Sequence, residues 1–129
     1  MEKTRILIVE DNYIISFELQ SALESMGYEV VSIEISGEDA IHEALDKLPD
    51  VVLMDIKLKG EMTGIEAAGY IHSKAKMPII FVSAYSMMES THGSYTSGPT
   101  GFLLKPIDYD YLRELIETHV SEYRTTALR

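Results

Sequence analysis

Four short apolar runs in this chain end in side chains that could bind a cation and handle a phosphoryl group. ILIV is followed by Glu10 and Asp11, VVLM by Asp55, PIIFV by Ser83, and GFLL by Lys105. In a parallel α/β sheet the carboxyl ends of the strands open onto one edge, where ligands bind. We therefore expect three carboxylates, one hydroxyl and one ammonium group to meet in a single shallow pocket.

The chemistry that these groups suit is phosphoryl transfer to a carboxylate. Asp55 is the candidate nucleophile, because a carboxylate can attack phosphorus and form an acyl phosphate. Glu10 and Asp11 could join Asp55 in holding Mg²⁺, which prefers oxygen ligands. Lys105 offers a compact positive charge on a flexible stem, and Ser83 offers a hydroxyl donor. Catalysis would then consist mainly of positioning and charge stabilisation.

Each of these residues has a simpler explanation when it is taken alone. An Asp that ends a strand is often a turn former or a helix cap, and Ser83 could cap the next helix. Glu10 and Asp11 could be acids of a first helical turn that face the helix dipole. The simpler explanation needs the same coincidence at four strand ends, so the set together favours a shared site.

The elements that must position these residues are five strands separated by amphipathic helices. Ser36 with Asp39, and Thr63 with Glu66, resemble capping boxes that start two of the helices. Alternation of strands with helices predicts a doubly wound parallel sheet with helices on both faces. The strands are expected at Arg5–Val9, Val30–Glu34, Val51–Met54, Ile79–Val82 and Phe102–Leu104.

Two segments fit this alternation less well. Residues Ser86 to Ser97 are rich in Ser and Thr and contain Gly93, so we expect a short or frayed helix there. The last helix opens at Asp108, and the tail after Tyr123 is either the end of that helix or the start of a linker. The whole chain, residues 1–129, is predicted to form one domain.

Composition excludes several classes of function. The formal charge of −10 argues against direct binding to nucleic acid or to an anionic membrane. The apolar runs are too short to span a bilayer. The chain has no cysteine, which fits a cytoplasmic location. Its four histidines lack the close spacing of a zinc site.

The ordered set of strand-end residues resembles the receiver domains of response regulators. The resemblance extends along the chain through ILIVEDN, DIKLKGEMTGIEAA, FVSAY and GFLLKP. It implies a flavodoxin-like (βα)5 fold with strand order 2-1-3-4-5. It also implies a two-component or phosphorelay switch, in which Asp55 accepts a phosphoryl group from a histidine kinase or a histidine phosphotransfer protein.

The same resemblance implies roles for individual residues. Mg²⁺ or Mn²⁺ would be held by Glu10, Asp11, Asp55 and the backbone carbonyl of Lys57. The peptide bond between Lys105 and Pro106 would be cis, which proline tolerates at low cost. Ser83 and Phe102 would couple phosphorylation to a change of the surface.

Output would pass through another protein or through a domain outside this chain, and phosphorylation could promote a homodimer. Three other functions are alternatives to a phosphorylated switch. A phosphatase of the haloacid dehalogenase type needs a second Asp two residues after the nucleophile, where this chain has Lys57. A flavin carrier needs a phosphate-binding loop where Glu10, Asp11 and Asn12 would repel phosphate. A receiver fold that binds partners without phosphorylation stays open, although the intact set of acids, Ser83 and Lys105 argues against it.

Overall fold

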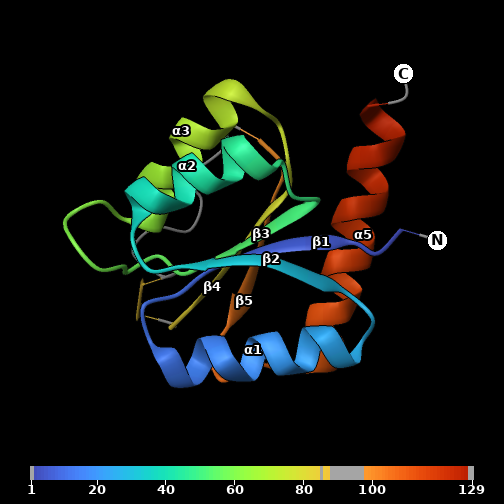
Figure 1. The fold of residues 1–129 in the computed structure, drawn as a ribbon, viewed down its shortest axis with the longest axis horizontal. Helices are drawn as coiled ribbons and strands as arrows, with labels where there is room; N and C mark the ends of the chain where they lie inside the picture. The colour runs from blue at the N-terminus through green and yellow to red at the C-terminus, as the bar shows by residue number, and fades with distance from the viewer. Residues whose placement is uncertain (1, 85, 88–97, 128–129) are drawn as a thin grey trace.

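Five parallel strands form one sheet in the order β2-β1-β3-β4-β5, which confirms the predicted flavodoxin-like order. The computed structural model describes residues 2–84, 86–87 and 98–127 (Figure 1). The strands are β1 (Arg5–Val9), β2 (Glu29–Glu34), β3 (Val51–Met54), β4 (Ile79–Ser83) and β5 (Thr100–Leu104).

The helices of the described residues cover both faces of this sheet. Figure 1 shows α2 and α3 on one face, and α1 and α5 on the other. Side chains of β1 alternate between the two cores, with Leu7 in the α2–α3 core and Ile6 in the α1–α5 core. The helices are α1 (Tyr13–Ser25), α2 (Gly37–Lys47), α3 (Gly64–Lys74) and α5 (Tyr109–Ala127).

The register of the strands brings the predicted site residues to one edge. Val9 of β1 pairs with Met54 of β3, and Asp55 N donates to the Val9 carbonyl at 2.9 Å. Ser83 pairs with Leu104, and Lys105 N donates to the Ser83 carbonyl at 3.0 Å. The residues that carry the expected chemistry therefore follow directly from paired positions.

Strand β5 begins two residues earlier than the prediction, at Thr100 instead of Phe102. Gly101 interrupts the apolar pattern and is a poor strand former. A Cβ at Gly101 would lie 2.7 Å from Nε2 of His119 in α5. The glycine therefore allows α5 to approach the strand closely.

The two segments of uncertain character have different outcomes. Helix α5 continues to Ala127, so the tail after Tyr123 is the end of that helix as far as the structure describes it. Most of the segment from Ser86 to Ser97 lies outside the described residues, and its frayed helix stays a prediction. None of the described helices is long and apolar enough to cross a membrane.

The outer edge of β2 is partly covered by a lysine from α2. Lys47 Nζ donates to the Val31 carbonyl at 3.3 Å. The same ammonium lies 2.9 Å from a carboxylate oxygen of Glu43, one helical turn earlier. A backbone acceptor on this sheet edge is thus satisfied by a charged side chain.

Only one of the two predicted capping boxes closes in both directions. Thr63 Oγ1 accepts from Glu66 N, and Glu66 Oε1 accepts from Thr63 N, so the box that starts α3 is complete. Ser36 Oγ accepts from Asp39 N at 3.2 Å, without a return bond from Asp39 among the described contacts. Asp is one methylene shorter than the Glu or Gln of a capping box, which explains the one-way cap.

We expect double-mutant cycles to separate the two caps. Thr63→Ala and Ser36→Ala should each lower the free energy of unfolding by about 1 kcal/mol, measured by urea denaturation. Thr63→Ala with Glu66→Ala should show a coupling of about 0.5 kcal/mol, because the two side chains act as a unit. Ser36→Ala with Asp39→Ala should be additive, and equal coupling in both pairs would contradict this description.

Candidate functional site

Asp55 lies at the centre of a polar cluster beyond the end of β3. Its side chain is buried, with 6% relative exposure. Oδ1 accepts from Ser83 Oγ at 2.7 Å and from Ile56 N at 2.7 Å. Oδ2 accepts from Lys105 Nζ at 2.8 Å. The structure thus brings together the carboxylate, hydroxyl and ammonium groups that the strand ends predicted.

Glu10 is the second buried carboxylate of the cluster, at 3% exposure. Its Oε2 accepts from Asn12 N at 3.1 Å. Its Oε1 lies 2.8 Å from Lys105 Nζ, and this contact is an ion pair without the geometry of a hydrogen bond. Lys105 therefore bridges Glu10 and Asp55.

The pKa values of Glu10 and Lys105 depend on the burial of each group and on the charges beside it. Burial raises the pKa of Glu10 to about 7, and the charge of Asp55 adds to this while Lys105 opposes it. Burial by itself would lower the pKa of Lys105, but its contacts with Asp55 and Glu10 outweigh that effect and raise the pKa. Lys105 is therefore a firmly charged ammonium group beside two carboxylates.

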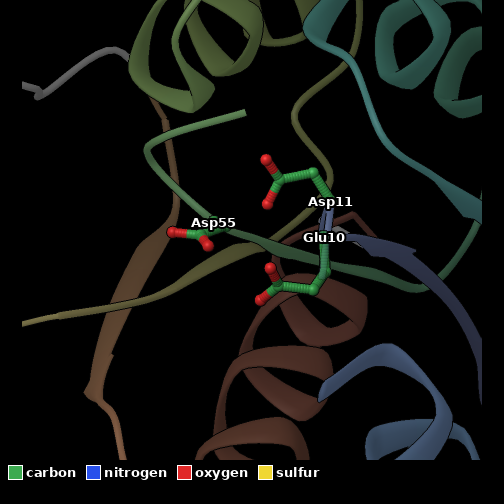
Figure 2. Close-up of side chains that lie close together, drawn as sticks. All are labelled: Glu10, Asp11 and Asp55. Carbon is green, nitrogen blue, oxygen red and sulfur yellow. The ribbon is translucent and has the colours of Figure 1, made fainter. Parts of the chain in front are cut away.

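Three carboxylates are arranged so that they could hold a divalent cation. Glu10, Asp11 and Asp55 each offer an oxygen, and these oxygens lie within 4.8 Å of one another. Figure 2 shows the carboxyl groups turned toward a common space beyond the ends of β1 and β3. Asp11 is exposed whereas the other two are buried, which leaves the space open to solvent on one side.

These residues fit Mg²⁺ by the chemistry of the donor set. Mg²⁺ takes hard oxygen ligands and keeps several waters, which an open site allows. Glu10 Oε1 contacts Lys105 Nζ at 2.8 Å, so a bound cation would share this carboxylate with the ammonium group. Lys57, whose backbone carbonyl is the fourth predicted ligand, lies two residues past Asp55 with its side chain exposed.

The remaining predicted residues lie near the cluster. Phe102 is half-buried and packs on Phe81, with ring centroids 5.4 Å apart and planes tilted by 30°. Ser83 is buried and already bonded to Asp55. The Lys105–Pro106 peptide bond is cis, in agreement with the expectation.

Asn12 is a contributor that the sequence reasoning missed. Its side chain caps α1 by accepting from Ile14 N and Ile15 N, at 2.9 and 3.1 Å. Its own backbone N–H binds Glu10, so the start of the helix also orients this carboxylate. An Asn directly before an apolar helical stripe is a typical N-cap signal and could have identified it.

Fold and site together define a class: a parallel α/β domain in which an acidic cluster, a hydroxyl and a lysine surround one aspartate at the carboxyl edge. The chain matches the response regulator receiver domain family over residues 6–117. It belongs to that family, whose members act as switches of two-component signalling.

Named relatives share this domain and extend beyond it. The transcriptional regulatory protein PdtaR of Mycobacterium tuberculosis is 35% identical over 120 residues, which cover 93% of this chain and 58% of the relative. The transcriptional regulatory protein ZraR of Salmonella typhimurium is 33% identical over 125 residues, covering 96% of this chain and 28% of the relative. The chain therefore spans 58% of the length of PdtaR and 28% of the length of ZraR.

Solved structures of a signal receiver domain and of a response regulator are also similar to this chain. The signal receiver domain of a modulated diguanylate cyclase from Desulfovibrio desulfuricans has 31% identity and a TM-score of 0.84, over 97% of this chain and 99% of that one. The response regulator PhyR from Brucella abortus has 28% identity and a TM-score of 0.84, over 98% of this chain and 51% of that one.

The raised pKa of Glu10 predicts a pH dependence of stability in the absence of divalent cations. The folded state holds the proton more tightly than the unfolded state, whose pKa is near 4.5. The contribution to the free energy of unfolding is therefore complete below pH 4.5 and is lost as the pH rises through about 7. Glu10→Gln should remove this contribution.

The measurement is urea denaturation in chelator between about pH 5 and pH 8. The difference between wild type and Glu10→Gln isolates the effect, because His72, whose burial lowers its pKa, contributes equally to both proteins. The exposed Glu18, changed to Gln, is the matched control. Parallel stability curves for wild type and Glu10→Gln would show that Glu10 does not titrate in this way.

Proposed function

We propose that this domain is a phospho-accepting switch in which Asp55 receives a phosphoryl group from a phosphohistidine donor. The donor would be a histidine kinase or a histidine phosphotransfer protein. One observation carries the proposal: the buried Asp55 carboxylate is held by Ser83 and Lys105 beside two further acids. Such an arrangement supplies a nucleophile together with the groups that neutralise the transferred charge.

The residues divide the chemistry of transfer among them. A carboxylate oxygen of Asp55 forms the new bond to phosphorus as the bond from phosphorus to the donor imidazole nitrogen breaks, and the imidazole leaves as a neutral ring after it takes up a proton. Lys105 and Ser83 are placed to bind phosphoryl oxygens. Glu10, Asp11, Asp55 and the Lys57 carbonyl would hold Mg²⁺ or Mn²⁺, which supplies further charge neutralisation when bound. The domain thereby assists its own phosphorylation and dephosphorylation.

Switching would use the contacts between β4 and β5. The hydroxyl of Ser83 is engaged by Asp55, so a phosphoryl group on Asp55 gives it a new acceptor. Phe102 of β5 pairs with Phe81 of β4, and Phe81 lies two residues before Ser83 on the same strand. A shift of Ser83 toward the phosphoryl group can therefore change the packing of Phe102, which biases a two-state equilibrium.

Output follows from this surface change. We propose that it acts on a downstream protein or on a further domain, since the curated relatives are longer proteins named as regulators. A homodimer formed on phosphorylation is a second route. The strongly acidic composition disfavours direct contact of this domain with nucleic acid. The cytoplasmic location stays a prediction.

The first test is intact mass after incubation with acetyl phosphate and Mg²⁺. We expect one phosphoryl addition to the wild type and none to Asp55→Asn, because the nucleophilic oxygen is lost. Asp46→Asn, an exposed change on α2, should be labelled like the wild type. Labelling that persists in Asp55→Asn would move the acceptor to another residue and refute the assignment.

The second test concerns Lys105. Lys105→Met keeps the length of the side chain and removes its charge, so Mg²⁺ binding should persist while phosphorylation no longer changes the amide NMR shifts of Phe102 and Leu104. Lys74→Met, which changes an exposed lysine near the end of α3, should keep the phosphorylation-dependent shifts. If Lys105→Met retains shifts of wild-type size, Lys105 does not couple the site to β5.

A further inference from the structure

A backbone hydrogen bond joins the two ends of the loop that connects Asp55 to α3. Gly64 N donates to the Ile56 carbonyl at 2.7 Å. A Cβ on Gly64 would collide with the backbone carbonyl of Asp55, so this approach requires glycine. Ile56 and Leu58 are buried while Lys57 and Lys59 are exposed, and the backbone bends at Ile56 and Lys57.

The same loop is also bonded to the turn that precedes α2. Lys59 N donates to the Ile35 carbonyl at 3.0 Å. Lys59 and Ser36 form an isolated parallel bridge outside the five-stranded sheet. The donor of this bond is the backbone N–H of Lys59, and the Lys59 side chain is exposed.

Met62 adds a side-chain contact to this bridge. Gly37, the first residue of α2, is buried, and a Cβ placed there would lie 2.7 Å from Cγ of Met62. Met62 is half-buried against the α2–α3 core. The Lys59 bridge and the Met62–Gly37 contact together form what we call the loop staple, which attaches the segment after Asp55 to the start of α2.

We propose that the loop staple positions the cation-binding segment, which makes the Lys59 backbone and Met62 positioning residues for Mg²⁺. The inference rests on the proposed function, in which Asp55 and Lys57 contribute ligands. Both of these residues precede the staple by a few positions, in or directly before the segment that connects β3 to α3. A segment that is already ordered loses less conformational entropy when it binds a cation.

The coupling must be reciprocal. If opening of the staple weakens Mg²⁺ binding by some factor, saturating Mg²⁺ must disfavour that opening by the same factor. Mg²⁺ should therefore slow hydrogen exchange at the Lys59 amide, although this amide is not a ligand. This effect can be measured without any phosphoryl donor.

The first experiment compares Lys59→Pro with Lys59→Ala by calorimetric titration with Mg²⁺ alone. Proline removes the N–H that binds the Ile35 carbonyl, whereas alanine keeps this N–H and removes only the exposed side chain. We expect Lys59→Pro to raise the Kd for Mg²⁺ by about tenfold, the scale of one backbone hydrogen bond, and Lys59→Ala to leave it unchanged. Equal Kd values for the two variants would overturn the proposal.

A second pair of variants decides the question if Lys59→Pro does not fold. Met62→Ala should raise the Kd, and Met62→Leu, which preserves most of the volume, should restore it. Tyr28→Phe is the control for a purely structural effect, because it removes a hydrogen bond to Glu117 far from the site. It should lower stability without changing the Kd, whereas a merely structural role for Met62 would give the same pattern in Met62→Ala and overturn the inference.

Hydrogen exchange supplies the independent readout. We expect Mg²⁺ to slow exchange at Lys59 by about the same tenfold that separates the two Lys59 variants. Exchange rates that do not change with Mg²⁺ would refute the coupling while leaving the proposed function intact. A wild-type domain that neither binds Mg²⁺ nor accepts a phosphoryl group would overturn both.

Discussion

The ammonium group of Lys105, held between two buried carboxylates, is the interaction on which the rest of the site depends. Burying an unpaired carboxylate costs several kcal/mol, and Glu10 and Asp55 are both nearly inaccessible to solvent. Lys105 reaches an oxygen of each at 2.8 Å and so makes their proximity tolerable. One ammonium group faces these two carboxylates and the nearby carboxylate of Asp11, so it neutralises the cluster only in part. The site therefore retains an unmet demand for positive charge.

Strand register brings the charged groups of the site together. Glu10, Asp55 and Lys105 follow three different strands, and none is close to the others in the sequence. Parallel pairing of β1 with β3, and of β4 with β5, brings their backbones to one edge. The two cores, one on each face of the sheet, hold these strands in place (Figure 1). A one-residue slip of any strand would turn its terminal side chain away from the cluster.

Sequence reasoning was most successful where a side chain signals its own role. The meeting of the strand-end residues follows from the apolar runs and the residues that end them, and the helix starts follow from the cap residues Ser36 and Thr63. The strand order was implied by the family resemblance. Sequence reasoning was less successful where the backbone acts alone. The bond between Lys59 and Ile35 leaves no pattern of residue types, and the early start of β5 reflects the pairing of Thr100 and Gly101 with β4. Such features depend on tertiary distances that no local pattern encodes.

The lysine that covers the edge of β2 has a consequence for self-association. An exposed sheet edge is a template on which another chain can add a strand, and natural proteins protect such edges with charged side chains. Lys47, the last residue of α2, donates a hydrogen bond to the Val31 carbonyl and forms an ion pair with Glu43. A second molecule that extended the sheet here would have to displace the ammonium group of Lys47 from the Val31 carbonyl. This penalty disfavours growth of the sheet from the β2 edge into another molecule.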